Sequence, residues 1–315
     1  MSAKIGLALA GGGPFGAIYE VGALMALEDA LDGLQLDDLD CYVGVSAGGF
    51  LAAALANGIP IREIHRLFIL DGEGDGAFTP GVFMRPAWRE YAARARRLPG
   101  LVARTAWRWT TQGASPASLE SFAALGQLVP TGLFDNQPID RYLESIFSQP
   151  GRSNDFRRLR RKLFVVATDL DRGESVTFGR EGHDAVPISR AVQASSALPG
   201  LFPPVEIDGR FFVDGALRKT MHASEALEEG AELVLCVNPL VPYDGRLGMR
   251  KGGEAGSRLA DGGLPVVLSQ TFRAVIHSRM TVGLAKYRGQ YPGSDVVLFE
   301  PEPDDHEIFF TSLFS

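Results

Sequence analysis

The sequence predicts an α/β domain built on a mainly parallel sheet. Short apolar runs alternate along the chain with longer segments in which apolar residues recur at helical spacing. This alternation is typical of strands and helices that follow one another in a parallel sheet. The 37 glycines among 315 residues show no collagen-like period and indicate many tight turns. The chain has no internal repeat and no clear linker, so we expect one domain over residues 1–315.

The expected strands are short apolar runs, and the expected helices lie between them. The first helix follows the first strand, because Ile18, Val21 and Met25 recur three or four residues apart. The strands are expected at residues 5–10, 41–45, 163–167, 211–213, 233–237 and 296–299, and the later helices at 48–57, 220–229 and 266–288.

Two stretches interrupt the alternation. Residues 71–130 have turn residues at both ends and helical sequence inside, so we expect a helical insertion that can act as a lid. Residues 242–265 are rich in glycine and charge, which predicts a loop near the start of a C-terminal extension, 241–315.

Composition excludes several classes of protein. No apolar run approaches the roughly 18 residues that span a bilayer, and the run before Gly11 is shorter than a signal peptide requires. A net charge of −7 argues against a nucleic-acid partner. Cys41 and Cys236 lie in apolar runs without metal-ligand spacing, so we expect buried thiols, a reducing compartment and a cytoplasmic protein.

A glycine-rich loop follows the first expected strand and opens the first helix. Gly11, Gly13 and Gly16 fit the G-x-G-x-x-G pattern of dinucleotide-binding folds, but that reading requires an acidic residue at the end of the second strand. That strand instead ends in Gly-Val-Ser at 44–46, which disfavours a dehydrogenase. Backbone N–H groups at a helix N-terminus still form a site for negative charge.

Residues 44–48 read Gly-Val-Ser-Ala-Gly and match the G-x-S-x-G pattern of a nucleophile elbow. The match lies between an expected strand and an expected helix, where such an elbow must be, and its glycines allow a sharp turn. We therefore expect Ser46 to be a nucleophile. In a parallel sheet its loop opens at the same edge as the glycine loop, whose amides can then stabilise an oxyanion.

A nucleophilic serine needs a base. In hydrolases whose catalytic residues occur in the order Ser, Asp, His along the chain, the base would be His222 or His277. Both histidines fall in helical sequence away from a strand end. Asp214 directly follows the apolar run 211–213, which places it at the same edge as Ser46. A carboxylate that is partly removed from water becomes more basic, so Asp214 is the better candidate.

Together these motifs resemble the patatin-like phospholipases. Gly-Gly-Gly-Pro-Phe-Gly at 11–16, Gly-Val-Ser-Ala-Gly at 44–48 and Asp-Gly-Ala at 214–216 occur in the family's order, and Ala-Thr-Asp-Leu at 167–170 and Ala-Ser-Ser-Ala-Leu-Pro at 194–199 resemble further signatures. Ala216 stands where a glycine is often found. The resemblance covers about residues 4–240.

The resemblance implies a three-layer α/β/α fold and a Ser–Asp dyad of Ser46 and Asp214 without a histidine. Gly11, Gly12, Gly13 and Gly16 match the oxyanion-loop positions. The implied reaction is hydrolysis of phospholipid or other acyl-lipid esters through an acyl-serine, with no metal or cofactor.

Residues 85–109 form a basic, tryptophan-rich segment that fits two interpretations, a membrane contact and a cap helix. Seven arginines and one acidic residue lie between Arg85 and Arg108, and all three tryptophans lie within 88–109. Tryptophan and arginine on an amphipathic helix suit an anionic bilayer surface, although a cap helix packed on the domain fits the same pattern. The candidate contact residues are Trp88, Arg89, Tyr91, Trp107 and Trp109.

Two questions stay open from the sequence. The apolar residues of the tail at 309–314 can dock on the domain or on a second subunit, so a homo-oligomer is one possibility. A non-catalytic lipid- or partner-binding protein that retains the fold is the alternative to an enzyme.

Overall fold

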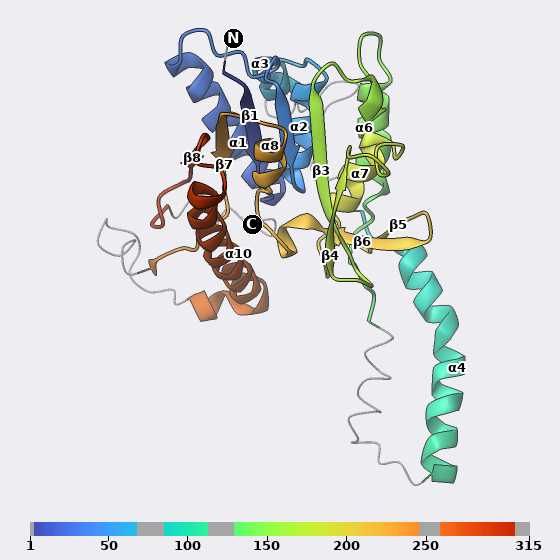
Figure 1. Ribbon diagram of the computed structural model, residues 1–315. Coiled ribbons are helices and arrows are strands. Elements are labelled where there is room, and N and C mark those ends of the chain that lie inside the picture. Colours follow the sequence, from blue (N-terminus) through green and yellow to red (C-terminus); the bar gives the residue numbers. More distant parts are fainter. Residues whose placement is uncertain (1–2, 68–84, 113–128, 246–258, 306–315) are drawn as a thin grey trace.

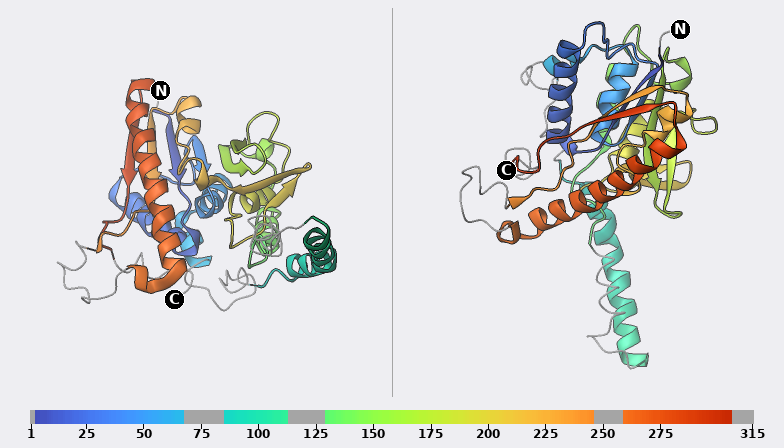
Figure 2. Two further views of the ribbon diagram at one scale, coloured as in Figure 1. Left: turned by 90° about the horizontal axis from the view of Figure 1, so that it is seen from below. Right: turned by 60° about the vertical axis from the view of Figure 1, so that its left-hand side comes forward.

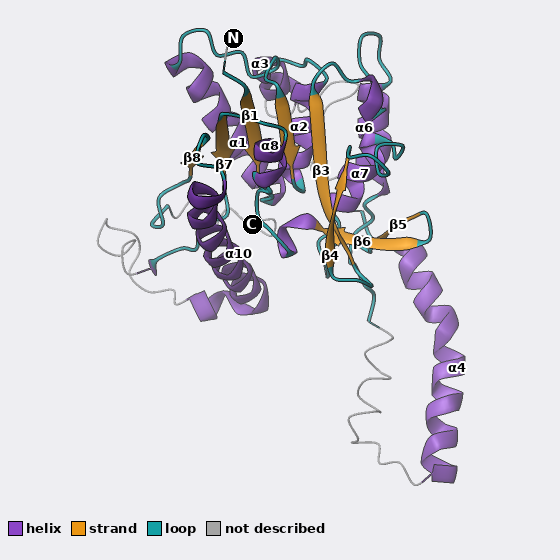
Figure 3. Ribbon diagram, in the orientation of Figure 1, coloured by secondary structure: helices purple, strands orange, loops and turns teal. Residues whose placement is uncertain are grey.

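The computed structural model describes residues 3–67, 85–112, 129–245 and 259–305 (Figure 1). These residues form one mixed sheet with helices on both of its faces (Figure 3). The α/β class and the three-layer arrangement predicted above are confirmed.

Five neighbouring strands of the sheet are parallel, in the order β3 (Lys162–Asp169), β2 (Cys41–Gly44), β1 (Ile5–Leu9), β7 (Leu233–Val237) and β8 (Asp295–Phe299). Beyond β3 the direction changes. The strands β4 (Glu174–Phe178) and β6 (Arg210–Asp214) both run antiparallel to β3, and β5 (Val205–Ile207) pairs with β6. The chain leaves β1 for β2 on one side and later reaches β7 on the other, so β1 lies where the strand order reverses. Ligand sites of open α/β sheets lie at the carboxyl ends of strands at such a position.

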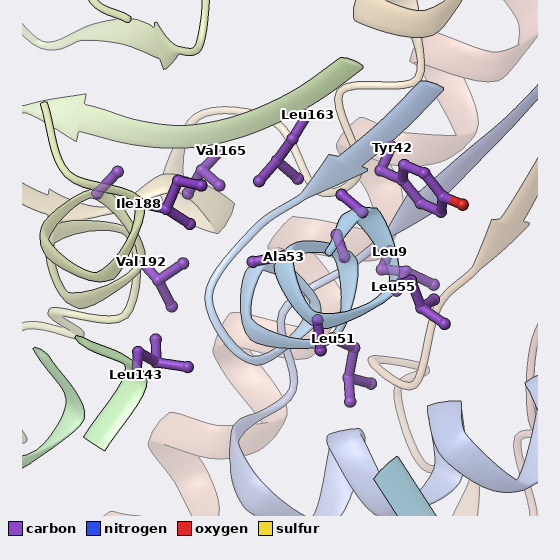
Figure 4. Close-up of a cluster of buried hydrophobic side chains, with 14 of the residues drawn as sticks. Leu9, Tyr42, Leu51, Ala53, Leu55, Leu143, Leu163, Val165, Ile188 and Val192 are labelled. Atoms are coloured by element: carbon purple, nitrogen blue, oxygen red, sulfur yellow. The ribbon is translucent and has the colours of Figure 1, made fainter. Parts of the chain in front are cut away.

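The side chains of the central strands alternate between two cores, as expected for strands that are buried on both faces. Leu7 and Leu9 enter the larger core, whereas Ala8 and Ala10 enter the smaller one. In the larger core, Leu9 lies near Leu51 and Leu55 of the small-residue helix α2 (Figure 4).

The helices that cover the larger core are α1 (Gly13–Ala30), α2 (Ala47–Ala56), α3 (Ile61–His65), α6 (Gln137–Phe147) and α7 (Ile188–Ser195). The smaller core is covered by α8 (Ser224–Glu228) and by α10 (Gly263–Gln290), which contributes Ile276 and Met280.

The structure corrects part of the sequence-based assignment. The helix expected at 220–229 is limited to the five residues of α8, because His222 has a positive φ of 48° that a helix cannot include. The short strands β4 and β5 and the helices α6 and α7 had not been expected. The Phe-Phe-Val run belongs to β6, which is antiparallel to β3 rather than parallel.

Within the 71–130 stretch the structure has the helix α4 (Trp88–Gln112), while residues 71–84 and 113–128 of that stretch lie outside the described residues. Figures 1 and 2 show α4 leading away from the sheet. The residues just before α4 are attached to the segment 131–135, since Ala87 N donates to Leu133 O at 3.1 Å and Asp135 N donates to Arg85 O at 2.8 Å.

Within the described part of the chain, no helix combines the length and the apolar character that crossing a membrane requires. Of the expected loop at 242–265, residues 246–258 lie outside the description, and α10 begins within its last residues.

Candidate active site

Ser46 stands at a sharp turn between β2 and α2, as the elbow pattern predicts. Its backbone has φ 54° and ψ −124°, a conformation that is uncommon for a residue other than glycine. The flanking glycines are required by space. A Cβ at Gly44 would lie 2.7 Å from Gly49 N, and one at Gly48 would lie 2.6 Å from the Leu9 carbonyl carbon. A larger residue at Gly44 would push the start of α2 away from β2, and one at Gly48 would push it away from β1.

Hydrogen bonds hold this turn on the neighbouring strands. Ser46 N donates to Ser195 Oγ at 2.8 Å, and Ser195 Oγ donates to Val166 O at 2.6 Å. On the other side, Gly48 N donates to Ala10 O at 3.1 Å. The strained serine is thus connected to β3 through α7 and to the end of β1.

Asp214 reaches the same edge by a different route from the one expected. It is the last residue of the antiparallel strand β6, which crosses the end of β3 so that Asp214 pairs with Ala167. Its backbone is fixed by Asp214 N, which donates to Ala197 O at 3.0 Å, and by Thr168 Oγ1, which donates to Asp214 O at 3.0 Å. Asp214 therefore lies at the carboxyl end of β3 although β6 runs antiparallel to that strand.

The Asp214 carboxylate is buried and contacts Ser46 directly. Burial raises its pKa to about 6, against the hydrogen bonds that it accepts from Ala216 N and from the Ser46 side chain. The Ala216 bond is 2.8 Å long. At neutral pH the group is mostly ionised yet more basic than an exposed aspartate, which suits proton abstraction from a serine.

The glycine loop lies against Ser46. A Cβ at Gly11 would lie 3.0 Å from the Ser46 Cβ and 3.6 Å from its Oγ. Gly13 has φ 63° and begins α1, whose first-turn N–H groups lack acceptors within the helix. Gly12 and Gly16 pack on Pro239, which follows β7. The structure therefore brings Gly11, Ser46 and Asp214 together.

The two histidines considered as bases are differently placed. His222 is buried, and burial, with the nearby Lys219 charge, lowers its pKa to about 3 against a hydrogen bond to the Gly215 backbone. Its ring is therefore neutral at pH 7 and touches the residue after Asp214. His277 lies on α10, where its Nε2 is 3.6 Å from Glu300 Oε1.

Three residues near the site were not singled out from the sequence. Ser195 occurs in the 194–199 motif, but its role in holding Ser46 N was not expected. Pro239 has no distinctive pattern around it. Glu20 is fully buried one helical turn beyond Gly16, and neither of its carboxylate oxygens has a hydrogen-bond partner of good geometry. Burial raises its pKa well above the ordinary glutamate value.

The candidate membrane residues lie on α4. Trp88 and Trp107 are exposed, whereas Tyr91 donates its hydroxyl to Leu133 O at 2.6 Å. The side chains of Arg89 and Trp109 lie outside the described part. Across the described residues, no group of three or more histidine, cysteine or acidic side chains is arranged to hold a metal ion.

Comparison with known proteins places this geometry in context. Uncharacterized NTE family proteins of Mycobacterium tuberculosis and Mycobacterium bovis are 37% identical over 74 residues, which is 24% of this chain. The match spans only about a fifth of those relatives, 19% of their length.

Among solved structures, VipD from Legionella pneumophila matches with a TM-score of 0.43 and 20% identity, over 80% of this chain and 52% of that one. The type III effector ExoU matches with a TM-score of 0.35 and 18% identity, over 88% and 53% of the two chains. Human GIVD cytosolic phospholipase A2 matches with a TM-score of 0.31 and 13% identity, over 82% and 45%.

The family comparison covers much more of the chain. The model described as "Patatin-like phospholipase" matches residues 7–227, a range that includes the glycine loop, the serine elbow and the Asp-Gly-Ala turn. With well over half of its sequence matched, this chain belongs to the patatin-like phospholipase family.

Proposed function

We propose that this protein is a lipid acyl hydrolase that cleaves carboxylic esters through an acyl-serine intermediate, with Ser46 as nucleophile and Asp214 as base. Membership of the patatin-like phospholipase family supports lipid hydrolase activity. The assignment of Ser46 and Asp214 as nucleophile and base is supported by the hydrogen bond between the Ser46 side chain and the buried Asp214 carboxylate. Burial raises the pKa of this carboxylate to about 6.

In the first half of the proposed reaction, Ser46 Oγ attacks the carbonyl carbon of the ester while its proton passes to the Asp214 carboxylate. The carbonyl oxygen becomes an oxyanion. Because Gly11 lies against the Ser46 side chain, the amides of the loop at Gly11, Gly12 and Gly13, with Gly16 shaping its close packing, are the donors that would stabilise this charge. The positive end of the α1 dipole acts in the same direction.

The tetrahedral intermediate then collapses. The bond to the leaving alkoxide breaks, and the carboxyl proton of Asp214 is returned to that oxygen, so that an alcohol leaves and Ser46 carries the acyl group. In the second half, Asp214 takes a proton from water as the water oxygen attacks the acyl carbon. The serine oxygen leaves with that proton, and a fatty acid is released.

A carboxylate can perform this step without histidine because its surroundings change its basicity. The Ala216 amide fixes the carboxylate plane while burial raises its pKa. His222 is neutral and contacts the Gly215 backbone, which supports a structural role for it rather than that of a base.

The substrate class and the setting belong to the same proposal. We take phospholipid or lysophospholipid as the substrate, presented at a membrane surface to which the protein binds peripherally. The exposed Trp88 and Trp107 on the arginine-rich α4 support this setting. The proposed organisation is a single domain over residues 1–315, with the insertion 71–130 and the C-terminal extension 241–315.

The test is covalent labelling with a fluorophosphonate probe, followed by intact-mass analysis and peptide mapping. We expect one adduct, on Ser46, in the wild-type protein and in His277→Ala, which serves as the matched control. Ser46→Ala should take no adduct, and Asp214→Asn should react at least about a hundredfold more slowly because the base is lost.

Two results would overturn the proposal. A folded wild-type protein that takes no adduct, even with detergent or vesicles present, would support a non-catalytic binding protein instead. Labelling that persists in Asp214→Asn but disappears in folded His222→Ala would replace the dyad with a histidine-based mechanism.

A further inference from the structure

The outer face of α10 carries apolar side chains that are exposed to solvent. Leu264, Leu268, Phe272 and Val275 recur three or four residues apart and so share one side of the helix. They are 69%, 43%, 38% and 50% exposed, whereas Ile276 and Met280 of the same helix are buried against the sheet. We call these four exposed residues the α10 outer face. A contiguous exposed apolar surface of this kind indicates an interaction site.

This face is attached to the loops of the candidate active site. Arg273 Nη1 donates to Pro239 O and Val241 O, both at 3.2 Å. Pro239 is the residue on which Gly12 and Gly16 pack. On the other side, Thr220 Oγ1, which follows the Asp214 turn, donates to Ile276 O at 3.1 Å. The position of α10 is therefore fixed relative to Ser46.

The charge of the helix has one sign. α10 contains Arg273, Arg279, Lys286 and Arg288 and no aspartate or glutamate, in a chain whose net charge is −7. α4 has the same character, with Glu90 as its single acidic residue. Figures 1 and 2 show that α4 and the beginning of α10 both extend past the same end of the sheet, on either side of it.

We propose that the α10 outer face binds an anionic lipid bilayer and, together with α4, presents the Ser46 edge of the sheet to that surface. The apolar side chains enter the interface, and the exposed cations Arg279, Lys286 and Arg288 contact lipid phosphates. Arg273 takes no part in this contact, because it is held by the carbonyl oxygens of Pro239 and Val241. Charge argues against a second copy of the chain as occupant. Two α10 helices paired through this face would bring cations together with no carboxylate on either helix to balance them.

This inference rests on the proposed function in one respect only, namely that the bound lipid is also the substrate. The binding test uses the full-length Ser46→Ala variant, so its result does not depend on hydrolysis, and labelling of Ser46 is judged separately. The protein is sedimented with phosphatidylcholine vesicles that contain or lack phosphatidylglycerol. In this background Leu268→Asp and Val275→Asp are compared with Leu31→Asp, which changes a leucine of similar exposure, 46%, at the far end of α1.

We expect the Ser46→Ala protein to bind the anionic vesicles. Leu268→Asp and Val275→Asp should each weaken this binding by about tenfold or more, because an aspartate opposes both the apolar contact and the lipid charge. Leu31→Asp should bind as before. All three sites are exposed, and thermal unfolding checks that each variant is folded.

Three outcomes would overturn the proposal: no binding of the Ser46→Ala protein to anionic vesicles, equal binding by all the variants, or equal loss in Leu31→Asp. A dimer seen by light scattering, converted to monomer by Leu268→Asp, would identify a second copy as the occupant and would also contradict it.

Discussion

The backbone around Ser46 is closely packed, whereas the helices α4 and α10 have open space beside their glycines. At Gly48 an added Cβ would overlap the Ala10 carbonyl oxygen, and at Gly215 it would overlap that of Val166. At Gly100 of α4 and Gly283 of α10, no atom lies within 4 Å of the corresponding position. The geometry around Ser46 therefore depends on close backbone contacts, whereas what α4 and α10 present to their surroundings depends on their exposed side chains.

This difference predicts where substitutions change folding and where they change binding. The largest effect is expected for Gly48→Ala. Alanine is the better helix former, but its Cβ would lie 2.6 Å from the Leu9 carbonyl carbon, and neither backbone can move without breaking the hydrogen bond from Gly48 N to Ala10 O. We expect the free energy of unfolding to fall by about 3–5 kcal/mol, measured by urea denaturation.

Gly49→Ala is the matched control, one residue along the same helix. Its added Cβ would meet Gly44 and Val165 at 3.5 Å, an ordinary contact distance. We expect a change of less than about 1 kcal/mol. Equal stability of the two alanine variants would show that the contacts between α2 and β1 do not fix the elbow.

The same distinction explains which features could be predicted from the sequence. Gly44, Ser46 and Gly48 are recognisable because the backbone of a strained turn restricts the residue type at each position. Asp214 was selected by a different signal, its place directly after an apolar run. The antiparallel direction of β6 was not predictable, because a strand of five residues carries no signal of its orientation.

Which side of α10 faces solvent was also not predictable from the sequence. Apolar residues lie on more than one side of this helix, so periodicity indicates a helix without showing which side packs on the sheet. Only the structure shows that Ile276 and Met280 face inward and that Leu264 and Val275 face solvent. The contact of Ser195 was not predictable either, since its hydrogen bond from Ser46 N joins residues 149 positions apart in the sequence.

The next effect in size concerns Asp214, where function and stability should respond to pH in opposite directions. The pKa of Asp214 is about 6 in the folded protein, whereas an aspartate exposed to water, as in the unfolded chain, has a pKa of 3.8. The difference arises because burial favours the neutral acid. The neutral Asp214 side chain stabilises the folded state fully at pH values below 3.8, the pKa of the unfolded chain. This stabilisation is lost as the pH rises through about 6, the pKa in the folded state. The ionised carboxylate then lowers the free energy of unfolding by about 3 kcal/mol.

We therefore expect Asp214→Asn to be more stable than the wild type by about 3 kcal/mol near pH 8 and nearly equal to it near pH 4. The hydrolysis rate of the wild type should rise about tenfold per unit as pH approaches 6 and level off above it, since only the ionised carboxylate accepts the serine proton.

Asp169→Asn provides a comparison of opposite sign. Burial raises the pKa of Asp169, but hydrogen bonds from the Arg172 amide and from Arg210 outweigh it and hold the pKa below its ordinary value. Removing this carboxylate should destabilise the protein at neutral pH. If Asp214→Asn were equally destabilising there, the buried charge of Asp214 would not be the strained feature of the site.

The smallest expected effect lies on the exposed side of the comparison, at Gly283. This glycine is in the interior of α10 with open space around it, so alanine can be accommodated without moving any neighbour. Alanine also loses less backbone freedom on folding than glycine does. Gly283→Ala should therefore raise the free energy of unfolding by about 0.5–1 kcal/mol in urea denaturation, with binding to anionic vesicles unchanged. A loss of stability instead would mean that another chain or segment occupies the space beside Gly283, and the contrast between the tightly packed Ser46 edge and the open helices would no longer hold there.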